Sequence, residues 1–153
     1  MPRDYQALTE LAARIAAGMD TRAARMKAVT DVLWDGLKDE AVSWCGFYVP
    51  TEDASKMVLE VCRDKPACSP IGLHGVCGQA FLSGEVQVVH DVKDLGDAYV
   101  ACDPSDRSEL VVPLVDAGGK CWAVLDLDSF ETGAFAADDA EGLKRVLAAA
   151  GLV

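Results

Sequence analysis

The stretch LVVPLVDAGGKCWAVLDLD, residues 110–128, decides the fold class. Two runs rich in valine and leucine flank the segment 116–119, whose aspartate and two glycines are typical of a turn. The stretch therefore predicts an antiparallel hairpin of strands 110–115 and 120–128. Pro113 has no N–H to donate to a neighbouring strand, so we expect its strand to lie at an edge or to be bulged there.

The second strand of this hairpin has two faces, because side chains alternate along a strand. One face is expected to carry Trp122, Val124, Asp126 and Asp128, and the other Cys121, Ala123, Leu125 and Leu127. Two carboxylates on one face cost energy unless a cation or hydrogen-bond donors meet them. Asp126 and Asp128 are therefore either solvated turn residues or contacts for a cationic ligand, such as an amino-acid ammonium. The pattern allows both.

The segments on either side of the hairpin predict the rest of the fold. Residues 43–49, 57–63 and 86–89 carry the same strand signature, and residues 74–82 favour a short helix. Apolar side chains at helical spacing predict a helical hairpin over about 5–38, with Asp20 or Thr21 capping its second helix. A last helix is expected after a cap at Asp138 or Asp139. The chain 1–153 therefore predicts a single α+β domain, an antiparallel sheet with helices on one face.

Composition and charge narrow the function. The net charge of −11 argues against nucleic acid and anionic membrane surfaces as partners. No run of 18 apolar residues could span a bilayer. The N-terminus carries Arg3 and Asp4 and no cleavable apolar core, so we expect a cytoplasmic protein. A small soluble ligand or a protein partner remains.

The six cysteines need a chemical reason in a reducing compartment. They contain no C-x-x-C pair, and the two histidines make no metal-binding spacing, so no metal site is predicted. Most of the thiols are expected to be core residues. Cys102 differs, because it lies in a long polar loop over residues 91–108. Arg107 would lower the pKa of its thiol and Asp103 and Asp106 would raise it, and the sequence does not decide between them.

Two further cysteines lie in a segment of repeated turns. Pro66 and Pro70 flank Cys68, so we expect it to lie in a loop and to be the reactive thiol of the two. Cys77 stands at the start of the short helix predicted over 74–82. A small thiol there either packs as alanine would or takes part in redox chemistry.

Taken together, these segments resemble the free methionine-(R)-sulfoxide reductases, which are built on a GAF domain. The matching segments follow the family's order over about residues 8–147 and are 44–48, 65–68, 75–78, 101–103, 107–109, 111–113 and 125–129. There are departures: Tyr99 stands where the family has a histidine, and the interval from Cys68 to Cys77 is one residue shorter. These departures affect loop geometry more than chemistry, since each cysteine and carboxylate of the pattern is present.

The resemblance implies a fold and a set of roles. It implies a six-stranded GAF sheet, with the ligand enclosed by loops on the face away from the helices. It implies that Cys102 is the nucleophile, that Cys68 resolves it through a Cys68–Cys102 disulfide, and that Cys77 is an alternative disulfide partner. The positions that it implies hold the substrate are Trp44, Glu109, Asp126 and Asp128.

The implied reaction is reduction of free methionine (R)-sulfoxide. Cys102 would take the oxygen as a sulfenic acid, Cys68 would condense with it, and a thioredoxin-like dithiol would reduce the disulfide. Glu109 or Asp126 would donate the proton, and Asp128 would keep its charge for the ammonium. No metal or organic cofactor is expected. The alternatives are a GAF module that only binds a small ligand and a redox sensor without a substrate. The sequence leaves the choice between a monomer and a homodimer open.

Overall fold

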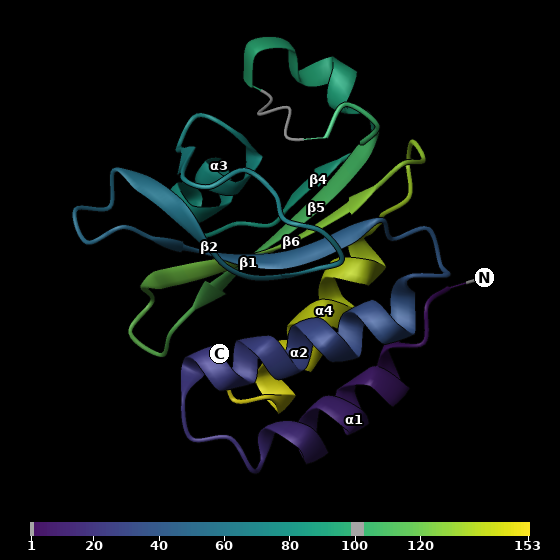
Figure 1. Cartoon of the computed structure of the whole chain (residues 1–153), viewed down its shortest axis with the longest axis vertical. Coiled ribbons are helices and arrows are strands. Elements are labelled where there is room, and N and C mark those ends of the chain that lie inside the picture. Colours follow the sequence, from purple (N-terminus) through teal and green to yellow (C-terminus); the bar gives the residue numbers. More distant parts are fainter. Residues whose placement is uncertain (1, 99–102) are drawn as a thin grey trace.

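The computed structural model describes residues 2–98 and 103–153. In chain order its elements are α1 (Tyr5–Ala16), α2 (Arg22–Leu37), β1 (Trp44–Pro50), β2 (Lys56–Arg63), β3 (Ile71–Gly72), α3 (Val76–Ser83), β4 (Gln87–Val89), the 3₁₀ segment η1 (Val92–Ala98), β5 (Ser108–Val115), β6 (Cys121–Ser129) and α4 (Ala137–Ala149). The strands form one antiparallel sheet in the order β3-β2-β1-β6-β5-β4. The predicted α+β fold is confirmed (Figure 1).

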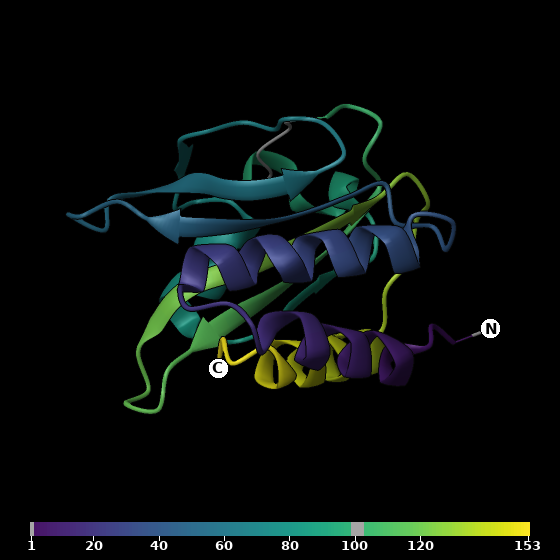
Figure 2. The same cartoon turned by 60° about the horizontal axis from the view of Figure 1, so that its bottom comes forward.

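The sheet separates two layers of different character. Helices α1, α2 and α4 cover one face, whereas α3 and the loops around β3 lie over the other (Figure 2). Because side chains alternate along a strand, each central strand contributes to both layers. In β1, Cys45 and Phe47 pack against the helices, and Trp44 and Tyr48 face α3. The face toward α3 is therefore the one on which polar and aromatic side chains from several strands meet.

The predicted hairpin of β5 and β6 is confirmed. Its turn is closed by the N–H of Asp116, which donates to the carbonyl of Lys120 at 2.9 Å, and by the N–H of Gly119, which donates to the carbonyl of Asp116 at 3.0 Å. Pro113 lies where β5 has only one neighbour, since β4 pairs with Glu109, Leu110 and Val111 and reaches no further. The expected edge is thus local, and β5 itself lies inside the sheet.

The predicted faces of β6 hold from Ala123 to Asp128 and are wrong before that. The register passes from Leu114 opposite Ala123 to Val115 opposite Cys121, so Trp122 is an extra residue in β6. A bulge of this kind reverses the alternation of side chains. Trp122 therefore packs beside the helical layer, where the Arg22 guanidinium lies 4.0 Å from its ring centroid. Cys121 packs instead with the cluster on the α3 side.

The helix ends agree with the sequence except at α4. Thr21, and not Asp20, caps α2, because its hydroxyl accepts from the N–H of Ala24 at 3.1 Å. The cap predicted at Asp138 or Asp139 is wrong: α4 begins at Ala137, and Asp139 lies in its first turn. From there the Asp139 carboxylate accepts from the backbone N–H of Ala136 and from Arg3. None of the helices in the described part of the chain is long and apolar enough to cross a membrane.

Candidate functional site

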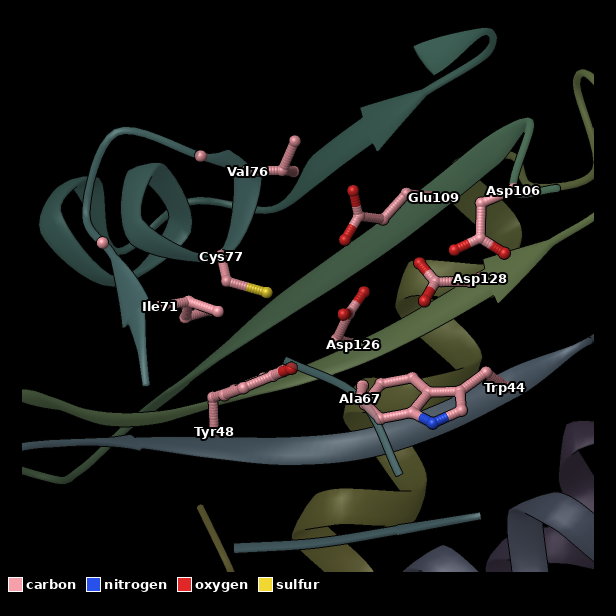
Figure 3. Close-up of a pocket in the computed structure, with 12 residues that line it drawn as sticks. Trp44, Tyr48, Ala67, Ile71, Val76, Cys77, Asp106, Glu109, Asp126 and Asp128 are labelled. Atoms are coloured by element: carbon pink, nitrogen blue, oxygen red, sulfur yellow. The ribbon is translucent and has the colours of Figure 1, made fainter. Parts of the chain in front are cut away.

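A pocket opens on the face of the sheet that α3 covers. It measures about 480 Å³, counting the space at its open side. Its walls come from β1, β3, β5, β6, the start of α3 and the segments before β3 and β5. The residues that line it are Trp44, Tyr48, Ala67, Ile71, Gly72, Gly75, Val76, Cys77, Asp106, Glu109, Asp126 and Asp128 (Figure 3). Five of the seven predicted site residues, Trp44, Cys77, Glu109, Asp126 and Asp128, are thus brought together here.

Three carboxyl groups are placed side by side by the register of the sheet. Glu109 on β5 lies directly opposite Asp128 on β6, and Asp126 lies two residues further along the same face. Like charges opposite each other on neighbouring strands are destabilising. Glu109 and Asp126 are also buried, with 8% and 5% of their surface exposed. The described residues that line the pocket include no lysine and no arginine to offset this charge.

Burial and mutual repulsion shift these acids toward their neutral forms. Burial, with repulsion from Asp128 and Glu109, raises the pKa of Asp126 well above its usual range. Burial of its carboxyl group, with repulsion from Glu109 and Asp106, raises the pKa of Asp128 in the same way, and burial also raises the pKa of Glu109. The site therefore holds protons more readily than exposed carboxyl groups do, or it can exchange them for a bound cation.

Asp106 joins this group from the segment that leads into β5. It is 9% exposed, and burial, with repulsion from Asp103 and Glu109, raises its pKa to about 7. Sequence reasoning treated Asp106 only as a neighbour of Cys102. It lies in irregular backbone, where no periodicity tells which way a side chain points. The polar loop over residues 91–108 indicated a functional segment, but nothing in it distinguished Asp106 from its neighbours.

Trp44 and Tyr48 form the aromatic wall of the pocket. Both project from the α3 face of β1, and their ring centroids are 6.2 Å apart. Gly46, between them, has no side chain because an added Cβ would lie 2.6 Å from the Trp44 ring. Tyr48 was missed as a lining residue, although alternation along β1 puts it on the same face as Trp44.

The same two aromatic side chains hold the loop that carries Cys68. The Trp44 Nε1–H donates to the carbonyl of Lys65 at 2.7 Å, and the Tyr48 hydroxyl donates to the carbonyl of Cys68 at 2.8 Å. Lys65 in turn forms an ion pair with Asp103. A neighbouring cavity continues from the pocket between residues 65–67 and 103–104 and shares Trp44, Ala67, Asp106 and Asp128 with it. The loop of Cys68 is thus fixed beside the acid pocket.

Cys77 enters the pocket from the first turn of α3. The helix approaches the preceding loop closely, since a Cβ on Gly78 would lie 2.2 Å from the carbonyl oxygen of Leu73. Burial, with repulsion from Asp126 and Glu109, raises the pKa of the Cys77 thiol well above its usual range. A thiol is a poor nucleophile compared with a thiolate, so this site disfavours Cys77 as an attacking group. The thiol sulfur and the carboxyl groups of Glu109 and Asp126 nevertheless offer three potential metal-ligand atoms within 4.8 Å of one another.

The remaining cysteines divide by position. Cys102, the predicted nucleophile, lies outside the described residues. Cys68 is exposed, in the loop between β2 and β3, and is not among the free thiols, which are Cys45, Cys62, Cys77 and Cys121 within the described residues. Cys45 is part of the helical core, where burial raises its pKa to about 12. Its environment is that of an inert core thiol, as expected for most of the cysteines.

Comparison with known proteins assigns the family. The family model of the GAF domain matches residues 21–153. The free methionine-R-sulfoxide reductase of Escherichia coli is 35% identical, over 95% of this chain and 81% of that protein. The reductase of the same name from Saccharomyces cerevisiae is 34% identical, over 76% of this chain and 67% of that protein. The X-ray structure of free methionine-R-sulfoxide reductase from Neisseria meningitidis in complex with its substrate superimposes with a TM-score of 0.86 at 31% identity, covering 95% of this chain and 85% of that one. This chain belongs to the free methionine-R-sulfoxide reductases, a family built on the GAF domain.

Proposed function

We propose that this chain reduces free methionine (R)-sulfoxide to methionine with the thiol of Cys102. The observation that carries the proposal is the pocket itself, in which Glu109, Asp126 and Asp128 lie beneath an aromatic wall. The carboxyl groups suit the cationic end of a small molecule, and the aromatic side chains suit a partly apolar remainder. Two relatives, from Escherichia coli and Saccharomyces cerevisiae, carry the name of this activity.

The carboxyl groups are proposed to bind the substrate's ammonium. An ammonium placed among Glu109, Asp126 and Asp128 would offset the repulsion that, together with burial, raises the pKa values of the two aspartates. A methionine residue inside a peptide has no ammonium to place there. Selectivity for the free amino acid then follows from charge, and the indole of Trp44 would pack against the side chain of the substrate. The preference for the R epimer rests on the names of the relatives.

The chemical steps follow from thiol chemistry. Cys102 attacks the sulfoxide sulfur, the S–O bond breaks, and the oxygen leaves with Cys102 as a sulfenic acid while methionine departs. The thiol of Cys68 then attacks the sulfenic sulfur, expelling water and forming a disulfide. Glu109 or Asp126 is proposed to donate the proton that the sulfoxide oxygen needs, which their raised pKa values favour. No metal or organic cofactor takes part in these steps.

Three observations support Cys68 as the resolving group. It lies exposed on the loop that Trp44 and Tyr48 hold beside the pocket. The ion pair between Lys65 and Asp103 joins that loop to the residue that follows Cys102 in the sequence. Cys77, the alternative partner, is buried and has a strongly raised pKa. Cys68 is thus the better placed thiol for exchange with a partner in solution.

The physiological setting is proposed from the same chemistry. A dithiol protein of the thioredoxin type would reduce the disulfide by exchange, and a cytoplasmic location would keep the cysteines in thiol form. We further propose that residues 1–153 act as one domain that includes the hairpin of about 5–38, because α1 and α2 share a core with β1, β5 and β6. A measurement of the molecular mass in solution decides between a monomer and a homodimer.

A coupled assay tests this function against the alternatives. NADPH oxidation is followed with thioredoxin and thioredoxin reductase, before and after addition of free methionine sulfoxide. The reductase should consume NADPH until about half of a racemic sulfoxide is gone, since one epimer reacts. A GAF module that only binds ligands, or a redox sensor, would give no sustained consumption.

A further inference from the structure

Three potential metal ligands meet at one point in the pocket. The Cys77 sulfur comes from α3, and the carboxyl oxygens of Glu109 and Asp126 come from β5 and β6. The three atoms lie within 4.8 Å of one another, and all three residues are buried. Figure 3 shows their side chains pointing toward a common space between α3 and the sheet. They are 32 and 17 residues apart in the sequence, so no spacing motif could have indicated them.

A second observation concerns the Asp126 carboxyl, whose neighbours in this space are the Glu109 carboxyl and the Cys77 thiol. Oδ1 of Asp126 is fully buried and makes no hydrogen bond within the described residues, and the residue is only 5% exposed. A buried acceptor that makes no hydrogen bond is destabilising. The Asp126 carboxyl is directed into the same space as the Cys77 thiol, where a ligand would satisfy it.

The presence of a thiol in this space favours a metal ion over an ammonium as the ligand. An ammonium is held by oxygen acceptors and gains little from sulfur, whereas zinc binds thiolate and carboxylate together. With zinc–ligand bonds of about 2.0–2.3 Å, tetrahedral neighbours lie roughly 3.5 Å apart. Ligand atoms within 4.8 Å need only small side-chain movements to reach that separation.

We propose that Cys77, Glu109 and Asp126 bind one zinc-class divalent cation, which occupies the substrate pocket and inhibits the reductase reversibly. The ion is not a cofactor, because the reaction does not use it. It binds as the thiol and the protonated carboxyl groups release their protons to solvent. Because Glu109 and Asp126 are also the proposed contacts of the substrate's ammonium, the ion and the substrate exclude each other.

Cobalt(II) binding to the full chain tests the site, because a cobalt–thiolate bond gives a charge-transfer absorption in the near ultraviolet. The parent protein carries Cys68→Ser and Cys102→Ser, which removes the other two thiols of the proposed reaction. We expect one Co²⁺ per chain, with the charge-transfer band, and displacement of Co²⁺ by Zn²⁺. Adding Cys77→Ala should abolish the band and weaken binding at least tenfold, and adding Asp126→Asn should weaken binding at least tenfold. Cys62→Ala is the matched control, since Cys62 is a free thiol on β2 that does not line the pocket, and it should change neither.

Two results would overturn the proposal. One is a parent protein without the charge-transfer band, and the other is a band that survives Cys77→Ala. Competition in the parent itself needs no further variant: free methionine sulfoxide should displace Co²⁺ and bleach the band. Only this last arm rests on the proposed function. If the band is present but saturating sulfoxide does not change it, the ion does not compete with the substrate and the proposed inhibition is wrong. The proposed reductase activity is then tested separately, by the turnover measurement.

Discussion

Glu109 and Asp128 lie directly opposite each other on neighbouring antiparallel strands, with their side chains on the pocket face of the sheet. Burial, with repulsion from Glu109, raises the pKa of Asp128, and Asp126 adds a third carboxyl group to the same face. A sheet gains nothing from such an arrangement by itself. It is explained by a cationic ligand that binds between the strands, which is the role proposed for the ammonium of methionine sulfoxide.

The Asp128→Asn substitution tests that role. Losing one partner of a desolvated charge pair costs about 2–5 kcal/mol, and a tenfold loss needs only about 1.4 kcal/mol. We therefore expect kcat/KM for free methionine sulfoxide to fall at least tenfold. Asp35→Asn is the matched control, because Asp35 is exposed on α2 in the layer across the sheet, and it should have no effect. An Asp128→Asn enzyme with unchanged kcat/KM would rule out an ammonium contact at this position.

The Cys102→Ser substitution tests the nucleophile. A hydroxyl group cannot accept the sulfoxide oxygen in a two-electron step, so steady-state turnover should be lost while the circular dichroism spectrum stays that of the wild type. Cys121→Ala should retain activity, since Cys121 lies at the start of β6 and does not line the pocket. Substantial steady-state turnover by Cys102→Ser would mean that another thiol attacks.

The Cys68→Ser substitution separates resolution from the first chemical step. We expect about one methionine per chain in a single turnover, followed by a stall with thioredoxin as reductant, because the sulfenic acid has lost its partner. Chromatography of the released methionine measures the burst. Full cycling of this variant would assign resolution to Cys77 or to direct reduction. Independently of that variant, mass mapping of the oxidised wild type should find Cys68–Cys102 as the main linkage.

The raised pKa of Asp106 predicts how stability depends on pH. An acid with a folded pKa of about 7 and an unfolded value near 3.8 binds its proton more tightly in the folded state. Its stabilising contribution is complete below pH 3.8 and is lost as the pH rises through 7. Asp106→Asn should therefore lose less stability than the wild type between pH 5 and pH 8. We expect a difference of about 1 kcal/mol or more in urea unfolding, since one pKa unit corresponds to about 1.4 kcal/mol.

A control and a contrary result complete this prediction. Glu60→Gln, an exposed substitution on β2, should leave the pH dependence of the wild type unchanged. If Asp106→Asn loses as much stability as the wild type on going from pH 5 to pH 8, Asp106 is solvated and does not hold a proton in the folded state.

Periodicity predicted the fold where the local pattern agrees with the tertiary structure. The hairpin of β5 and β6 follows from alternation and a glycine turn, and the pocket carboxyl groups of Asp126 and Asp128 follow from the same alternation. The pattern failed where an insertion is decided by packing: the bulge at Trp122 reverses the faces of Cys121 and Trp122. It also could not place β3, which has only two residues, or Asp106, which lies in irregular backbone.

The site residues that lie on regular strands could be predicted from the sequence, whereas the burial of Cys77 could not. Trp44, Glu109, Asp126 and Asp128 lie on strands, so a strand face and a resemblance together were enough to collect them. Tyr48 was available from alternation along β1 and was missed. The burial that raises the pKa of Cys77 depends on the close approach of α3 to the Leu73 carbonyl, which no local pattern encodes.

The comparison of free with N-acetylated methionine sulfoxide tests the central claim most directly. Both substrates present the same sulfoxide, and only the free amino acid brings an ammonium to Glu109, Asp126 and Asp128. In the thioredoxin-coupled assay, kcat/KM for the free form should exceed that for the N-acetyl form at least a hundredfold, which needs about 2.7 kcal/mol of discrimination. Equal rates for the two sulfoxides would contradict the account, because the acid pocket would then contribute nothing to substrate choice.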